Sequence, residues 1–155
     1  MSQSNEPSRQ PTELDVFLGE WRAEGTSYGG TDQSGDDPKA NGEKWESEHK
    51  AWWHTGGFFQ IEDECARPGG AVFDTHWVRG IDPETGRMFA SSFENHGHLR
   101  AYDLTRDGDT WTLSGPTERA TIKFTKDNRR QEIVWEWKPE DQWLPLCDRT
   151  AVRVD

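Results

Sequence analysis

The placement of tryptophan is the feature that most constrains the fold of this chain. Nine tryptophans occur in 155 residues, and most of them have charged or polar neighbours. Residues 42–53 show the pattern most clearly, because polar and aromatic side chains alternate there with a period of two. One face of this segment would carry Trp45, Ser47, His49, Ala51 and Trp53. Such alternation is typical of a strand with one buried and one solvated face, so we expect sheets that turn large rings toward a common interior.

The same alternation, interrupted by turn residues, continues along the chain. The segments that we predict to be strands are residues 20–28, 42–53, 58–66, 71–80, 87–94, 98–105, 110–114, 119–125, 131–138 and 146–154. Before them, Leu14, Phe17 and Leu18 are at helical spacing, which predicts a short helical turn over residues 13–18. The series indicates an antiparallel sandwich or barrel, and simple up-and-down order with short turns favours closure. The predicted fold class is therefore all-β, an antiparallel up-and-down closed barrel of about ten strands.

Length and charge place limits on the domain organisation and the partners. A chain of 155 residues is expected to form one domain, with residues 1–12 as a polar, disordered tail and residues 13–155 as the barrel. No apolar run approaches the roughly 20 residues that span a bilayer, and we expect a cytoplasmic protein. The net charge of −11 argues against nucleic acid and anionic membranes as partners. The two cysteines, Cys65 and Cys147, are expected to be reduced, packed thiols.

The segment Phe17-Leu18-Gly19-Glu20-Trp21 carries a resemblance to a known fold family. A Gly-x-Trp at the head of the first strand, after a short helical turn, resembles the opening of lipocalin-like (calycin) barrels. The resemblance implies that Trp21 closes one end of the barrel and that an arginine of the last strand packs across it. Arg149 and Arg153 lie on that predicted strand, and a guanidinium over an indole makes a favourable cation–π contact.

More narrowly, residues 12–155 resemble an uncharacterised bacterial family of unknown function with this fold. The motifs that carry the resemblance are Leu18-Gly19-Glu20-Trp21, Gly42-Glu43-Lys44-Trp45, Asp82-Pro83-Glu84-Thr85-Gly86, Trp111 before Gly115, and Trp135-Glu136-Trp137 followed by Trp143 and Arg149. The family implies a ten-stranded barrel with an internal cavity and no particular activity. Haem-binding nitrobindin-like barrels of the same superfamily hold iron through a histidine near the C-terminal end. This chain has no histidine after His98, which argues against haem unless an earlier histidine substitutes, and no metal or cofactor is expected.

The leading functional hypothesis is reversible binding of a small, partly apolar molecule inside the barrel. The predicted aromatic lining is Trp45, Trp53, Trp77, Trp135 and Trp137. His49 lies on the aromatic face of its strand and is predicted to fix a polar end of the ligand together with Arg100 and Tyr102. If the face that carries His98, Arg100 and Tyr102 points inward, it suits a carboxylate head group; if outward, it is ordinary surface.

Two other functional classes remain open. In an enzyme of isomerase, cyclase or hydrolase type, His49 or the pair Asp74 and His76 would act inside the cavity. Glu62 and Glu64 share a face with Gln60, which we expect to be solvated, with Ile61 and Cys65 on the buried side. The segment His96-Gly97-His98 is expected to be a solvated hairpin rather than a metal site.

In an interaction scaffold, the barrel would form a homodimer through an exposed aromatic face. Trp52, Trp143 and Phe58 lie off the predicted inner faces and are the candidates for such a surface.

Overall fold

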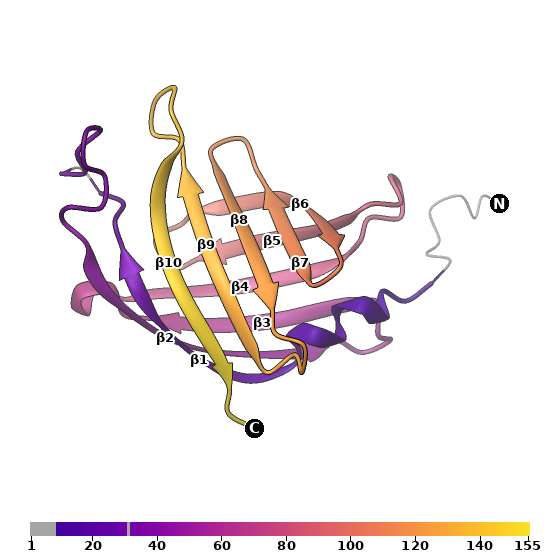
Figure 1. The fold of residues 1–155 in the computed structure, drawn as a ribbon. Coiled ribbons are helices and arrows are strands. Elements are labelled where there is room, and N and C mark those ends of the chain that lie inside the picture. Colours follow the sequence, from indigo (N-terminus) through magenta and orange to yellow (C-terminus); the bar gives the residue numbers. More distant parts are fainter. Residues whose placement is uncertain (1–8, 31) are drawn as a thin grey trace.

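Ten antiparallel strands, each paired with the next along the chain, make up most of the structure (Figure 1). The computed structural model describes residues 9–30 and 32–155. Its elements in chain order are the 3-10 helix η1 (Thr12–Phe17), β1 (Gly19–Ser27), β2 (Glu43–Trp53), β3 (Phe59–Ala66), the 3-10 helix η2 (Pro68–Gly70), β4 (Phe73–Ile81), β5 (Met88–Glu94), β6 (Leu99–Asp107), β7 (Thr110–Ser114), β8 (Glu118–Phe124), β9 (Arg130–Trp137) and β10 (Leu144–Arg153). The predicted strands and the predicted helical turn are all present, with ends displaced by a few residues.

The sheet closes on itself because the first strand also pairs with the last. The β1–β10 register runs from Trp21 opposite Arg153 to Ser27 opposite Cys147. A close approach at Gly25 allows this pairing, since a Cβ atom there would lie only 1.8 Å from the carbonyl oxygen of Asp148. Closure leaves no strand edge exposed, and the prediction of an up-and-down barrel rather than a sandwich is confirmed.

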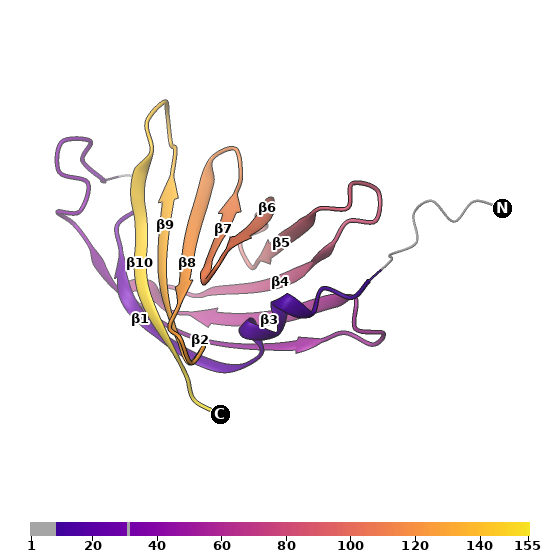
Figure 2. The same ribbon diagram turned by 45° about the vertical axis from the view of Figure 1, so that its right-hand side comes forward.

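One end of the barrel is filled by η1, which lies at the same end as the C terminus (Figures 1 and 2). Its apolar side chains Leu14 and Phe17 are buried, and the Phe17 ring meets both Trp111 and Phe124 edge-on with centroids 5.1 Å apart. The indole nitrogen of Trp21 donates to the carbonyl oxygen of Phe17 at 3.1 Å. These contacts make the end with η1 the closed end of the barrel.

The boundary of the predicted tail differs from the structure. Residues 1–8 lie outside the described residues, but residues 9–12 are part of the fold. Pro11 is buried, and the side-chain amide of Gln10 donates to the carbonyl oxygen of Gly56 in the β2–β3 turn at 2.6 Å. The low hydropathy of residues 9–12 predicts a disordered tail, but these residues are ordered because they pack on the closed end of the barrel.

The other end of the barrel is the mouth, bordered by the β1–β2, β3–β4, β5–β6, β7–β8 and β9–β10 connections. Side chains of alternate residues on each strand point into the barrel, as the buried positions of β8 show: Ala120, Ile122 and Phe124. Small residues on neighbouring strands, including Ala23, Ala51 and Ala151, leave room opposite the large rings. The interior is therefore lined by large aromatic rings on one side and by small residues on the other.

Candidate functional site

The barrel interior holds two adjacent chambers. A deep chamber of about 50 Å³ lies next to Phe17, and a mouth chamber of about 270 Å³ lies toward the open end. The residues that line both are Glu64, Trp77, Trp135 and Arg149. The deep chamber has room for a small polar group or ordered water, while the mouth chamber approaches the size of small-molecule sites.

An aromatic cluster lines the mouth chamber, and two of its rings also line the deep chamber. Ring centroids of Trp77 and Tyr102 are 5.7 Å apart, those of Trp77 and Trp135 are 6.1 Å apart, and those of Tyr102 and Trp135 are 5.7 Å apart. All three side chains are buried. They come from β4, β6 and β9, so the register of distant strands brings them together. Large rings of this kind supply most of the contact area in small-molecule sites.

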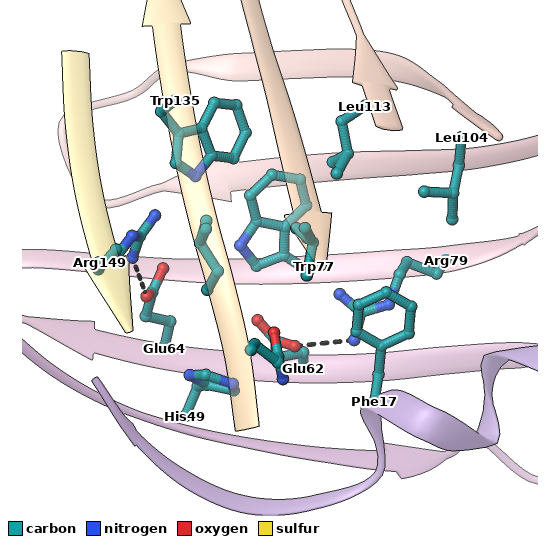
Figure 3. Close-up of a pocket in the computed structure, with 13 residues that line it drawn as sticks. Phe17, His49, Glu62, Glu64, Trp77, Arg79, Leu104, Leu113, Trp135 and Arg149 are labelled. Atoms are coloured by element: carbon teal, nitrogen blue, oxygen red, sulfur yellow. Dashed lines mark hydrogen bonds and ion pairs between the residues drawn. The ribbon is translucent and has the colours of Figure 1, made fainter. Parts of the chain in front are cut away.

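Two ion pairs cross the deep chamber (Figure 3). A guanidinium nitrogen of Arg79 lies 2.7 Å from the Glu62 carboxylate, and one of Arg149 lies 2.6 Å from that of Glu64. Arg79 also donates to the side-chain oxygen of Gln60 at 2.9 Å and lies over the Phe17 ring, 4.4 Å from its centroid. The four charged side chains are at most 10% exposed.

The expectation that Glu62 and Glu64 lie on a solvated face is wrong. Both are buried with Gln60, while Cys65 on the opposite face of β3 is exposed. The rule that a polar face points outward fails here because arginines of β4 and β10 supply a partner for each carboxylate inside the barrel.

The protein stabilises the charged forms of Glu62 and Arg149. Burial opposes ionisation of Glu62, but the electrostatic effects of Arg79, His49 and Arg149 and the hydrogen bond from Arg79 outweigh it and lower the pKa of this carboxyl group. Burial likewise opposes the charge of Arg149, and Glu64 outweighs it, so the pKa of this guanidinium group is raised. The charged side chains of the deep chamber therefore neutralise one another within an otherwise largely apolar lining.

Three buried nitrogens in this region have no hydrogen-bond partner within the described residues. They are Nδ1 of His49, Nε2 of Gln131 and Nε of Arg149. The His49 ring is 7% exposed, lies parallel to the Trp21 indole with centroids 6.0 Å apart, and sits beside Glu62 and Glu64 (Figure 3). Unpartnered buried polar atoms are costly, so they indicate a place where water or a ligand atom belongs.

At the mouth, the face of β6 that carries Arg100 and Tyr102 points inward, which answers the question that the strand pattern left open. Nε of Arg100 lies 3.2 Å from Glu118 Oε2, and the Tyr102 hydroxyl donates to Glu118 Oε1 at 3.2 Å. Burial, helped by the charge of Glu118, raises the pKa of Tyr102, which therefore keeps its proton. The place expected for a ligand carboxylate is already taken by a carboxylate of the protein.

The structure brings most of the predicted ligand-binding residues together. The mouth chamber is lined by Trp45, Trp77, Arg100, Tyr102 and Trp135, and the deep chamber by His49, Trp77 and Trp135. Trp53 and Trp137 line neither chamber. The indole of Trp53 donates to Asp15 in η1 at 2.8 Å, and that of Trp137 donates to Gln33 in the β1–β2 connection at 2.8 Å. These hydrogen bonds hold η1 and the β1–β2 connection against the barrel.

The residues expected to close the barrel are arranged differently from the pattern implied by the resemblance. Trp21 is buried at the closed end, and Arg153 lies directly opposite it in the β1–β10 register, paired with Asp155 at 2.7 Å. The Arg149 guanidinium lies over Trp45, 4.3 Å from the ring centroid, in the chambers rather than at the closed end.

The sequence reasoning missed four polar residues of the deep chamber: Glu62, Glu64, Arg79 and Gln131. One signal could have found the three charged residues among them. Arg79 is two residues from Trp77 and therefore shares its inward face, and a buried guanidinium requires a carboxylate nearby. Glu62 and Glu64, on the preceding strand, are the acids within reach.

Other candidate groups lie outside the chambers. His76 is exposed and contacts Asp63 on the outer surface at 2.6 Å, and Asp74 pairs with Arg67 at 2.8 Å. These two residues therefore do not act together inside the barrel.

Within the described part of the chain, no group of three or more His, Cys, Asp or Glu side chains could hold a metal ion. Over residues 9–30 and 32–155, no helix is long and apolar enough to cross a bilayer.

The residues considered for an interaction surface are divided between the two ends of the barrel, with Trp52 and Phe58 in the β2–β3 hairpin at the closed end and Trp143 in the β9–β10 connection at the mouth. Trp52 is 38% exposed on β2. Trp143 is half-buried beneath Arg119, whose guanidinium carbon is 4.1 Å from the ring centroid. Phe58 is half-buried in the β2–β3 turn.

Comparison with known proteins supports the fold. No family model and no curated protein matches the chain. Among solved structures, that of Rv2717c from M. tuberculosis is similar, with a TM-score of 0.66 and 13% identity over 93% of this chain and 96% of that one. The S-type phycobiliprotein lyase CPES from Guillardia theta is similar with a TM-score of 0.59 and 12% identity, over 96% of this chain and 94% of that one.

These neighbours are lipocalin-like barrels, and this chain has the same fold. Their low identity makes the likeness one of fold alone. Membership of the uncharacterised bacterial family stays a prediction that depends on the sequence motifs.

Proposed function

We propose that this protein reversibly binds a small, partly apolar molecule in the mouth chamber. The observation that carries the proposal is a chamber of about 270 Å³ that is open to one end of the barrel and has Trp77, Tyr102 and Trp135 as its wall. A closed barrel supports such a site well, because its interior is already formed before the ligand arrives.

The likeness to a phycobiliprotein lyase is compatible with small-molecule binding by a barrel of this shape. The polar residues of the mouth would orient the bound molecule. Near the deep chamber, Nε2 of Gln131 and Nε of Arg149 would donate hydrogen bonds to a protruding group or to water, and Nδ1 of His49 would donate or accept one. A cytoplasmic location is part of this proposal.

Native mass spectrometry of protein purified without denaturation tests the proposal first. A mass excess that disappears under denaturing conditions would identify a retained ligand, which would then be titrated against tryptophan fluorescence. The aromatic wall predicts a change in emission at saturation.

A matched pair of variants tests the location. Ser92 lies in the mouth chamber and is buried, whereas its neighbour Ser91 is on the opposite face of β5. Ser92→Phe should fill part of the chamber and weaken binding at least about tenfold, while Ser91→Phe should leave affinity within about twofold. Equal affinities of both variants and the parent protein would place the ligand elsewhere and contradict the proposal.

Catalysis on the bound molecule is a second candidate, favoured by the position of His49. This imidazole is buried beside two carboxylates and has a free Nδ1 atom, which suits transfer of a proton to or from a ligand. The substitution His49→Gln would separate the two functions: a catalyst loses turnover with retained ligand affinity, whereas a carrier shows no turnover of its isolated ligand in either form.

A further inference from the structure

The charges that line the two chambers do not balance. The lining carboxylates are Glu62, Glu64, Glu94 and Glu118, and the lining guanidiniums are Arg79, Arg100 and Arg149. Each guanidinium is already paired with a carboxylate: Arg79 with Glu62, Arg149 with Glu64, and Arg100 with Glu118. Glu94 is the carboxylate left without an arginine, so the interior carries one net negative charge when its histidines are neutral.

Glu94 is buried at the rim of the mouth chamber. Its side chain is 8% exposed, and its Oε1 atom accepts hydrogen bonds from the backbone nitrogen of His96, at 2.5 Å, and from that residue's ring nitrogen Nδ1. Among the described residues, the Oε2 atom has only the more distant ring of His98, with Nε2 at 3.9 Å. Within the described residues, no lysine or arginine forms an ion pair with Glu94. A buried carboxylate that lacks a fixed cation favours a ligand that brings one.

The surroundings of Glu94 suit an organic cation. The same chamber contains Trp45, Phe73, Trp77, Tyr102 and Trp135, and aromatic faces attract an ammonium group as well as an apolar body. The whole protein carries a net charge of −11, which concentrates cations and repels anions near its surface. A carboxylate ligand would meet the opposite conditions, since the charge of each lining arginine is already compensated by a glutamate.

Resting on the proposed function, we infer that the ligand is a small organic amine. Its ammonium group binds Glu94 at the mouth, and its apolar body lies against Trp77, Tyr102 and Trp135. A fatty acid or another apolar carboxylate is excluded by the same charges. This assignment concerns the charge and shape of the ligand and is independent of whether the bound molecule is carried or transformed.

Three probes with the same apolar body test the inference: 2-(1-naphthyl)ethylamine, 2-(1-naphthyl)ethanol and 1-naphthylacetate. Calorimetric titration at pH 8 keeps a primary alkylamine protonated. The amine should bind at least about tenfold more tightly than the alcohol, as expected for a hydrogen bond to a buried charge, and the acetate should bind most weakly. Raising the salt concentration should reduce the preference for the amine.

The variant Glu94→Gln keeps the shape of the side chain and removes its charge. It should lower the affinity for the amine to that for the alcohol and leave the alcohol unchanged. Glu140→Gln is the matched control, because Glu140 is exposed in the β9–β10 connection at the same end of the barrel and the substitution changes the net charge equally. This control should keep the full preference for the amine, and thermal melting of both variants checks their folding.

The outcomes separate the two proposals. If the alcohol or the acetate binds as tightly as the amine, or if the preference survives Glu94→Gln, the amine assignment is overturned while small-molecule binding stands. If none of the three probes binds at millimolar concentration and no ligand is retained on purification, both the assignment and the proposed function are overturned.

Discussion

At the closed end of the barrel, apolar packing and hydrogen bonds leave little open space, whereas the mouth end keeps a chamber between charged and aromatic side chains. Phe17 and Leu14 seal the closed end, and the buried amide of Gln60 donates to the carbonyl oxygen of Leu14 at 2.8 Å. At the mouth, Arg100 and Glu118 are paired but partly exposed, and Glu94 lacks an arginine. Stability should therefore depend mainly on the closed half, and ligand selectivity on the open half.

The largest expected difference concerns the two kinds of ion pair. Replacing Arg79 by Met leaves Glu62 buried without its partner and should lower the free energy of unfolding by about 3–5 kcal/mol. Arg100→Met at the mouth should lower it by at most about 1 kcal/mol, because solvent screens that pair. Urea unfolding of both variants measures the contrast.

The double variant Arg79→Met with Glu62→Met serves as the control for that contrast. It should recover most of the lost stability, since neither charge is then left alone. Equal losses for Arg79→Met and Arg100→Met would show that the deep ion pair is no more important to the fold than the mouth pair.

Aromatic packing should also contribute more to stability at the closed end than at the mouth. Phe17 is 3% exposed and touches two aromatic rings, so Phe17→Ala should lower the free energy of unfolding by about 3 kcal/mol. Phe73, half-buried at the mouth, should lower it by about 1 kcal/mol when replaced by Ala. Thermal or urea unfolding measures the stability of both variants. A larger loss of stability for Phe73→Ala would show that the mouth, and not the closed end, contributes more to stability.

Acid should weaken the closed half through Glu62. The folded protein lowers the pKa of this carboxyl group, so the stabilisation is complete above the ordinary value of about 4.5 and is lost as the pH falls through the lowered folded-state value. Glu62→Gln should therefore flatten the decline of stability in this acidic range. Urea midpoints between pH 7 and pH 3 provide the measurement, and identical slopes for the variant and the parent protein would refute the role of Glu62.

The smallest effect should be a difference in thiol reactivity. Cys147 is buried and lines the mouth chamber, and burial is the main cause that raises its pKa to about 11. Cys65 is exposed on the outer face of β3. Iodoacetamide at pH 8 should modify Cys65 at least about tenfold faster than Cys147, as followed by peptide mass spectrometry. Comparable rates would mean that the Cys147 thiol is readily exposed to solvent.

Much of the chamber could be anticipated because alternation along a strand is a local property. The pattern around Trp45 and His49 correctly placed both side chains inside the barrel, and the same holds for Trp77 and Trp135. Trp53 and Trp137 are on the predicted inner face of their strands, but they lie at the strand ends and reach neither chamber. Their indoles instead form hydrogen bonds with η1 and with the β1–β2 connection. How far along the barrel axis a side chain lies depends on register, which alternation does not contain.

The sequence by itself determined the all-β class, the order of the strands and the aromatic character of the interior, because these follow from periodicity and turn residues within short segments. Only the tertiary structure decided that Glu62 and Glu64 lie inside. Their burial depends on Arg79, which the β3–β4 register supplies from the neighbouring strand, and on Arg149, which closure of the barrel brings from β10. In the same way, the tertiary structure pairs Arg100 with Glu118 and leaves Glu94, among the described residues, without an arginine. Charge compensation between distant strands is a property of the folded barrel, and local sequence patterns do not record it.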